Sequence, residues 1–475
     1  MWRTCTVRFL RAAVVVALTA VLSLLLASQA SAPLPAGSSR FLRAGQVDAI
    51  PDYNWYPGYY VLNSRDTAAS KRSILDDPLV QPFTGVQFRY HWAASERRPG
   101  DYSAGFATLD ADLKRVSAKG KKIMVMLMYK KFDGTSAVPA DLRTGPGPWC
   151  SGSYCGELTT DNDTSLALLW NPVVEARLNA WITAMALHLS QSPYRGNVAG
   201  IVFNETALGT TDATVLASAN YDPDVYIQAI EDNMLAATTA APRLITILYF
   251  EGGFVSRNGG VVRAGEKIGN WMLLHPRTGA GTPDLKPKSP KGTNHPCTNS
   301  KYQSHIACAP AVQAPDYSTA VTDSFDQSFD YATAPVPDGH HASFFTFSYA
   351  VGAGPNAFTF ADVSNNIASH PIPNIARPWP VNPVAGVVRK VSLTSPIRVG
   401  KDASLTVSVS PRARCTVDVI YRTVVPKPKG LGAKSGGRIT WRWRVATATP
   451  PGRWPVIVRC GNGGTLNLRI RVLPR

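Results

Sequence analysis

The chain has 475 residues, 45% of them hydrophobic and 17% charged, a foldable globular composition that excludes collagen-like and disordered chains. At roughly 150 residues per domain, this length predicts two or three domains, or one large barrel with an appended module. Lys and Arg number 49 against 32 Asp and Glu, for a formal net charge of +17. This balance argues against an acidic disordered tail, and the 37 Gly and 37 Pro argue against a cytosolic helical bundle.

Residues 1–32 have the pattern of a secretory signal peptide. Arg3, Arg8 and Arg11 form a basic start, and an apolar run from Ala12 to Ala27 is followed by small residues. The run is shorter than the ~20 residues that a membrane span needs, which favours a cleaved leader over an uncleaved anchor. We therefore expect a secreted protein, extracellular or in the cell envelope, with no stable membrane insertion.

The segment 33–384 alternates between apolar runs typical of buried strands and stretches with helical periodicity. Helices are predicted at residues 106–118, 172–189 and 222–240. Strands are predicted at residues 59–62, 85–90, 122–128, 198–203, 244–250, 271–274, 309–313 and 343–347. Such a series predicts an α/β fold, a (β/α)8 TIM barrel. The alternative is an open doubly wound sheet, but no glycine-rich phosphate loop follows the first strand.

Residues 385–475 differ in charge from the rest, because they hold 18 Lys and Arg but only Asp402 and Asp418 as acids. A proline-rich stretch just before them predicts a linker. Several segments alternate with period two, which predicts a C-terminal all-β domain, an immunoglobulin-like sandwich. Nucleic acid is a poor partner for a secreted basic domain, whereas an anionic cell-wall polymer, an acidic polysaccharide or a membrane surface fits its charge. The alternative is that the charge serves only solubility.

Six cysteines remain after the leader, an even number that fits disulfides in an oxidising compartment. Proximity in the sequence predicts three pairs, Cys150 with Cys155, Cys297 with Cys308, and Cys415 with Cys460. A zinc site is the alternative, but the sequence has neither C-x-x-C nor H-E-x-x-H spacing. We therefore expect no metal and no other cofactor.

Candidate site residues are the polar and aromatic side chains after each strand, because barrel active sites lie at the carboxyl ends of the strands. Aromatic rings there offer a large flat contact surface, so Trp92 and Tyr129 are expected to contact substrate. In chain order the candidates are Arg89 and Trp92, Tyr129-Lys130-Lys131, Asn204 and Glu205, Glu251, Asp284, and Asp316.

Val202-Phe203-Asn204-Glu205 resembles the fourth strand end of glycoside hydrolase clan A, the barrels of cellulases, mannanases and β-galactosidases. This resemblance implies that Glu205 is the acid/base and that Asn204 contacts the sugar 2-hydroxyl. The run 85–89, followed by Trp92 and Glu96, is similar to the clan's second strand, whose arginine, here Arg89, braces the nucleophile. The resemblance spans about residues 55–375.

Glycosidic cleavage needs a second carboxyl group beside the acid. Glu205 fits the acid, because burial after an apolar strand favours the protonated form of a carboxyl group. The clan has its second Glu after the seventh strand, where this sequence has none, so Asp316 and Glu251 are level candidates and Asp284 is the third. Asp316 could instead cap a helix, and Glu251 could simply begin a loop.

Two functions follow from these patterns. The first is a secreted retaining glycosidase that acts on a poly- or oligosaccharide. The second is a non-catalytic carbohydrate-binding or cell-surface attachment protein on a degenerate barrel. A serine esterase is disfavoured, because no G-x-S-x-G elbow occurs.

Overall fold

The computed structural model describes most of the chain from residue 53 onward. The residues outside this description are 1–52, 64–66, 145–146, 148–149, 152–153, 160–163, 209–220, 252–263, 276, 286–294, 304, 313–323, 336–337, 350–357, 375–386, 420–430, 461–464 and 475. The predicted leader, the proline-rich linker and Asp316 therefore lie outside the described residues.

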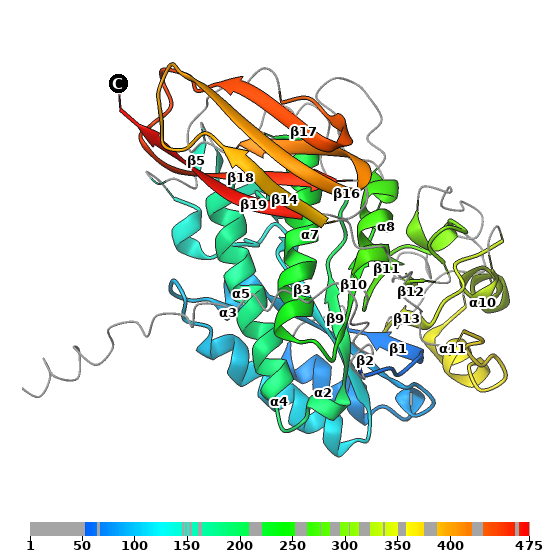
Figure 1. The fold of residues 1–475 in the computed structure, drawn as a ribbon. Coiled ribbons are helices and arrows are strands. Elements are labelled where there is room, and N and C mark those ends of the chain that lie inside the picture. Colours follow the sequence, from blue (N-terminus) through cyan, green and yellow to red (C-terminus); the bar gives the residue numbers. More distant parts are fainter. Residues whose placement is uncertain are drawn as a thin grey trace, which may run out of the picture. The chain divides into compact units, whose positions relative to one another are not determined.

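Eight parallel strands close into a barrel, as the alternation of strands and helices predicts (Figure 1). Around the barrel they are β1 (Gly58–Leu62), β2 (Gly85–His91), β3 (Lys122–Met128), β9 (Val198–Phe203), β10 (Ile245–Tyr249), β11 (Thr278–Thr282), β12 (Ala307–Val312) and β13 (Phe344–Ser348). The order follows the sequence, and β13 pairs with β1 to close the sheet. The alternative of an open doubly wound sheet is therefore wrong.

The strands are apolar on both faces because both faces are buried. On β3, Ile123, Val125 and Leu127 join the core between barrel and helices. Met124 and Met126, which alternate with them, join a separate core that includes Tyr60 and Tyr249. This double burial explains why the strands read as continuous apolar runs rather than as an alternating pattern.

Helices follow most barrel strands and cover the outer face (Figure 1). They are α2 (Ala68–Asp76), α3 (Trp92–Ser95), α4 (Ser103–Ala118), α5 (Pro172–Gln191), α7 (Pro223–Ala240), α8 (Ala264–Leu274), α10 (Phe325–Thr333) and α11 (Phe360–Asn366), with short 3₁₀ helices η1 (Pro78–Val80), η2 (Ala140–Leu142), η3 (Arg195–Asn197) and η4 (Pro296–Thr298). Asn171 and Asp222 cap α5 and α7 with their side chains, and a proline follows each cap. No helix in the described part of the chain is long and apolar enough to cross a membrane.

The predicted sixth strand, residues 271–274, is wrong, because this segment is the last turn of α8. The sixth strand is β11, Thr-Gly-Ala-Gly-Thr, whose small residues carry no apolar signal. The neighbours require this composition, since a Cβ on Gly281 would lie 2.3 Å from the Ala309 carbonyl oxygen. The close approach of β12 therefore selects glycine over the branched residues that usually mark a strand.

A small antiparallel sheet follows β3, and the sequence did not predict it. Its order is β4 (Lys130–Lys131), β8 (Ser165–Ala167), β7 (Glu157–Thr159), β6 (Tyr154–Cys155) and β5 (Cys150–Ser151). Pairing with β8 makes Lys130 part of an ordered strand instead of a loose loop, and its side chain is buried.

The C-terminal domain is a curled mixed sheet of β14 (Val387–Leu393), β15 (Ile397–Arg398), β16 (Asp402–Val419), β17 (Lys434–Arg444), β18 (Gly452–Cys460) and β19 (Thr465–Leu473). The first half of the long strand β16 pairs with β14 and β17, and its second half pairs with β18. Apolar side chains from both halves form one core, among them Leu405, Trp441, Val456 and Ile470. The domain is thus all-β as predicted, and its immunoglobulin-like topology stays a prediction.

The structure contains the three disulfides expected from proximity, Cys150–Cys155, Cys297–Cys308 and Cys415–Cys460. The last pair joins β16 to β18, where the two cysteines lie directly opposite each other. Three disulfides fit an oxidising compartment.

Candidate active site

Glu205 forms an ion pair with a lysine at the carboxyl end of the barrel. It follows β9, and its Oε1 lies 3.0 Å from Nζ of Lys130, which follows β3. The Lys130 side chain is only 3% exposed and that of Glu205 is 17% exposed. Lys130 also donates to the carbonyl oxygen of Ala207, so its ammonium group is held between two acceptors.

Burial lowers the pKa of Lys130, and the carboxylates of Glu205 and Glu251 partly oppose this shift. Both acidic groups therefore act on one buried ammonium group. Because a buried charge is costly without a partner, the two carboxylates stabilise the charged form of Lys130.

Glu251 follows the adjacent strand β10 and is fixed by two threonines. Its backbone N–H donates to Oγ1 of Thr206 at 2.9 Å, and that hydroxyl donates to the Glu251 carbonyl at 2.8 Å. On its side chain, Oε1 accepts a hydrogen bond of 2.9 Å from Thr282, the last residue of β11. Asp284 comes two residues later, with its N–H 3.4 Å from the same Thr282 hydroxyl. Three predicted acids thus follow three neighbouring strands.

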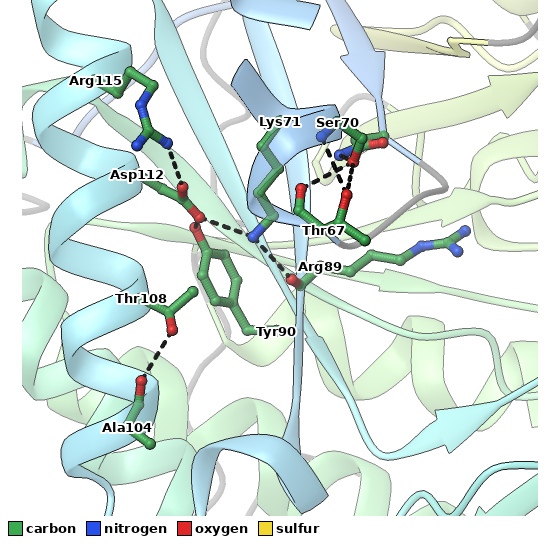
Figure 2. Close-up of polar contacts among 10 residues, drawn as sticks. Thr67, Ser70, Lys71, Arg89, Tyr90, Ala104, Thr108, Asp112 and Arg115 are labelled. Atoms are coloured by element: carbon green, nitrogen blue, oxygen red, sulfur yellow. Dashed lines mark hydrogen bonds and ion pairs between the residues drawn. The ribbon is translucent and has the colours of Figure 1, made fainter. Parts of the chain in front are cut away.

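Arg89 lies on β2, whose opposite face carries a buried polar cluster (Figure 2). There, Lys71 Nζ lies 2.8 Å from Asp112 Oδ2, and the Tyr90 hydroxyl donates to the same oxygen at 3.0 Å. This cluster ties α2 and α4 to β2. Figure 2 shows the Arg89 side chain extending away from Asp112 and Tyr90. The Nε atom of Arg89 is buried and has no hydrogen-bond partner among the described residues.

The charge of Arg89 also acts on Tyr249, a member of the inner core. Burial raises the pKa of the Tyr249 phenol, whereas its hydrogen bond with Gln87 and the charge of Arg89 oppose the shift. Arg89 is thus near the barrel interior. Its bracing of a nucleophile, which the clan resemblance implies, stays a prediction.

Two aromatic residues expected to contact sugar are instead core residues. Trp92 is completely buried, stacks on Trp181 and donates a 2.6 Å hydrogen bond to Glu96. Tyr129 is 4% exposed and packs against Phe203 in the core between barrel and helices. Both rings are covered by the protein, so the structure gives no support to substrate contact by Trp92 and Tyr129, which stays a prediction. Large apolar rings after buried strands are drawn into the helix layer.

Asn204 also has a different role from the one its resemblance implies. The side chain is buried, its Oδ1 accepts from the Tyr129 backbone N–H at 3.1 Å, and its Nδ2 donates to the Glu205 carbonyl. These bonds tie the end of β3 to the end of β9. Asn204 therefore positions Glu205 and the segment before Lys130, and its implied contact with a sugar hydroxyl stays a prediction.

Sequence reasoning placed Lys130 and Thr206 after their strands and Thr282 before Asp284, but it gave none of the three a function. A lysine directly after an apolar strand was the available signal for Lys130. The roles of the two threonines carry no such signal, because they depend on the meeting of three strand ends in space.

One buried group of potential metal ligands occurs in the described part of the chain, His295, Cys297 and His340. Cys297 is already bonded to Cys308. His295 uses Nδ1 to accept from the Cys297 backbone N–H, and its Nε2 lies 3.2 Å from the Gly281 carbonyl. These bonds occupy the Cys297 sulfur and both ring nitrogens of His295, two of the three potential ligands, so this group is better explained as packing beneath β11.

A cavity of about 300 Å³ lies at the opposite end of β9 and β10, lined by residues that include Asn54, Arg195 and Arg243. It is at the amino ends of these strands, where barrel residues usually serve stability rather than catalysis. We therefore do not assign chemistry to it.

No family model and no curated protein sequence matches this chain. Among solved structures, the chain is similar to an exo-β-1,4-mannosidase from Opitutaceae bacterium strain TAV5, with 16% identity, a TM-score of 0.37 and coverage of 67% of this chain but only 56% of the mannosidase. The catalytic domain of β-amylase from Paenibacillus polymyxa matches with 9% identity and a TM-score of 0.42 over 62% of this chain and 93% of that domain. A β-galactosidase from Marinomonas ef1 matches with 10% identity and a TM-score of 0.41 over 66% of this chain and 59% of that enzyme.

Proposed function

We propose that the barrel is a secreted glycoside hydrolase that cleaves O-glycosidic bonds of a poly- or oligosaccharide. Glu205 is its general acid/base, and a second carboxylate is its nucleophile. The observation that carries the proposal is the position of Glu205, a partly exposed carboxyl group at the carboxyl end of β9 with a second acid on the next strand.

Glu251 is the stronger candidate for the second carboxylate among the described residues. Its side chain is oriented by Thr282, and it acts on the same Lys130 ammonium group as Glu205. A nucleophile must be held in one orientation, and the hydrogen bond from Thr282 provides this for Glu251. Asp316 remains the alternative, and Asp284 the third candidate or a ligand for substrate hydroxyls.

A retaining mechanism uses these groups in two steps. Glu205 first donates its proton to the glycosidic oxygen as the bond to the anomeric carbon breaks, while Glu251 attacks that carbon and forms a glycosyl-enzyme. Ionised Glu205 then takes a proton from water, whose oxygen attacks the anomeric carbon and releases Glu251. The Lys130 ammonium group stabilises Glu205 in its ionised form, between these two proton transfers.

The test is Glu205→Gln in the full chain, assayed on a panel of unactivated glycans and on nitrophenyl glycosides. General acid catalysis contributes roughly 10²–10⁴-fold, so turnover of unactivated glycans falls by about that factor. Nitrophenyl glycosides need little protonation of the leaving group, so bond cleavage suffers far less. Full activity of the variant on an unactivated glycan would refute the assignment. Glu251→Gln and Asp316→Asn are compared beside it, since loss on both substrate types marks the nucleophile.

The second candidate is a non-catalytic carbohydrate-binding protein on the same barrel. The ion pair with Lys130 favours it, because it gives the Glu205 carboxylate a partner 3.0 Å away within the protein. In that case the wild type and Glu205→Gln bind the same glycans, and neither releases product.

A further inference from the structure

The outer face of the first half of the C-terminal sheet carries arginines around a row of hydroxyl groups. Ser404, Thr406 and Ser408 alternate along β16 with Leu405 and Val407, which face the core. On β17 the residues directly opposite the three hydroxyl residues are Arg442, Thr440 and Arg438. On the other side of β16, Arg389 of β14 lies opposite Ser408.

We call Arg389, Arg438, Arg442 and Arg444 with this hydroxyl row the arginine face. Alternate residues on a strand lie about 6.8 Å apart and neighbouring strands about 4.8 Å apart. Arg389 and Arg438, two strands apart, therefore flank the hydroxyl row with about 10 Å between their backbones. The result is an extended strip with cationic borders and a polar floor.

The arginine face has little internal compensation for its charge. Its ion pair within the described residues joins Arg444 to Asp402 at 4.0 Å, and both side chains are more than 70% exposed. Such a pair contributes little to stability. Arg389, Arg438 and Arg442 are exposed and have no carboxylate partner in the described part of the chain. Exposed like charges that are not paired within the protein are available to an anionic ligand.

We propose that the arginine face binds an anionic polysaccharide that carries carboxylate or sulfate groups. Guanidinium groups donate in pairs to such oxyanions, and serine and threonine hydroxyls exchange hydrogen bonds with sugar hydroxyls. The site is independent of the proposed chemistry of the barrel and would hold the enzyme on a charged glycan surface.

The composition of the arginine face disfavours two other polyanions. Stable membrane binding uses Trp, Phe or Leu on the contacting surface, but Trp441 and Trp443 of β17 point into the core. Single-stranded nucleic acid stacks its bases on exposed aromatic rings, and the three tryptophans of the described domain are all buried. An oxyanion-bearing glycan needs neither feature.

The other half of the sheet supplies a matched control. Arg453 of β18 lies directly opposite Arg471 of β19, and Arg469 lies opposite Pro455. All three arginines are exposed, but they surround no comparable row of hydroxyl groups. They face outward from the other half of the sheet, because both halves share one core. Removing them lowers the net charge by the same amount as removing Arg389, Arg438 and Arg442.

The experiment compares the full chain with two triple variants, Arg389→Gln/Arg438→Gln/Arg442→Gln and Arg453→Gln/Arg469→Gln/Arg471→Gln. Binding to immobilised polygalacturonate, dextran sulfate and neutral dextran is measured at low and at high salt. Circular dichroism and thermal melting confirm folding. At about fivefold for each arginine, the first variant loses about 100-fold in affinity for its charged ligand at low salt. The control variant loses less than about fivefold.

The proposal is supported when the wild type binds either charged glycan, salt weakens this binding and neutral dextran does not bind. In addition, only the first variant must lose the binding. The two charged polymers then tell carboxylate from sulfate recognition. Equal losses in both variants would show that only net charge matters and would overturn the proposal. It would also be overturned if neither charged glycan binds, or if anionic phospholipid vesicles or DNA bind more tightly than both. Since the variants leave the barrel intact, none of these results depends on Glu205.

Discussion

Lys130 offers the sharpest test of the electrostatics at the candidate site. The substitution Lys130→Met keeps most of the apolar side chain and removes the ammonium group that lies 3.0 Å from Glu205. At an effective dielectric constant of about 20, two unit charges at this distance attract each other by about 5 kcal/mol. Loss of one partner of a buried pair costs about 3–5 kcal/mol, and we expect the lower end because Glu205 is 17% exposed and can be hydrated.

The same substitution tests whether the pair serves the proposed reaction. If Glu205 is the acid/base, loss of its ammonium partner at 3.0 Å should lower kcat/KM on unactivated glycans. Lys130→Arg keeps a cation at this position and should retain more of the activity.

Lys131→Met is the matched control from the same strand. Lys131 pairs with Asp133 at 3.3 Å, but the Asp133 side chain is 58% exposed, so this pair contributes about 0–1 kcal/mol. The assay is urea unfolding at pH 7 for the three variants beside the wild type, with kcat/KM on an unactivated glycan. A loss of stability in Lys130→Met that is no larger than in Lys131→Met would refute the contribution of the buried pair.

Burial, and then a nearby carboxylate, raise the pKa of Glu175 from 4.5 to about 7. Between these pH values the folded state therefore binds more protons than the unfolded state, and it loses stability as the pH rises through them. We expect Glu175→Gln to raise the free energy of unfolding by up to about 3 kcal/mol at pH 8, seen as a higher Tm, but not at pH 4. Equal gains at both pH values would contradict this. Replacing both Cys415 and Cys460 by alanine opens a loop with a sequence separation of 45 and should lower the free energy of unfolding by about 4 kcal/mol, which denaturant titration measures. Gly281→Ala should destabilise the barrel by about 2 kcal/mol or more because its Cβ would meet the Ala309 carbonyl, whereas Gly196→Ala, with open space around its Cβ, should be neutral within about 0.5 kcal/mol in thermal melts.

The fold was largely predictable because its local signals agree with its tertiary arrangement. Strands such as β3 and β9 are apolar on both faces, and α5 and α7 begin at an Asn-Pro and an Asp-Pro cap. The exception is β11, where contact with β12 selects small residues and removes the apolar signal. The close contact with β12 determines which residues β11 can contain, so no local sequence pattern could reveal this strand.

The site was predictable in part, since the strand-end rule selects Glu205, Glu251 and Asp284 but says nothing of side-chain direction. A residue after a parallel strand can turn toward the barrel mouth or into the helix layer. Trp92 and Tyr129 turn into the helix layer, because apolar contacts there stabilise their rings more than exposure at the mouth would. Hydrogen bonding sets the direction of the Asn204 side chain, because its Oδ1 accepts from the backbone N–H of Tyr129 just after β3.

Lys130 shows why the charge balance of the site could not be inferred from the strand-end residues alone. It is separated from Glu205 by 75 positions, and only the closure of β3 onto β9 brings the two groups together. Pairing of β4 with β8, and the carbonyl of Ala207, then hold the ammonium group under the carboxylates. A buried lysine of this kind must remain paired to stay charged, so the two glutamates and Lys130 act as one electrostatic unit. Substitution of Lys130 therefore changes the charge environment of both glutamates at once, an effect that no single strand end reveals.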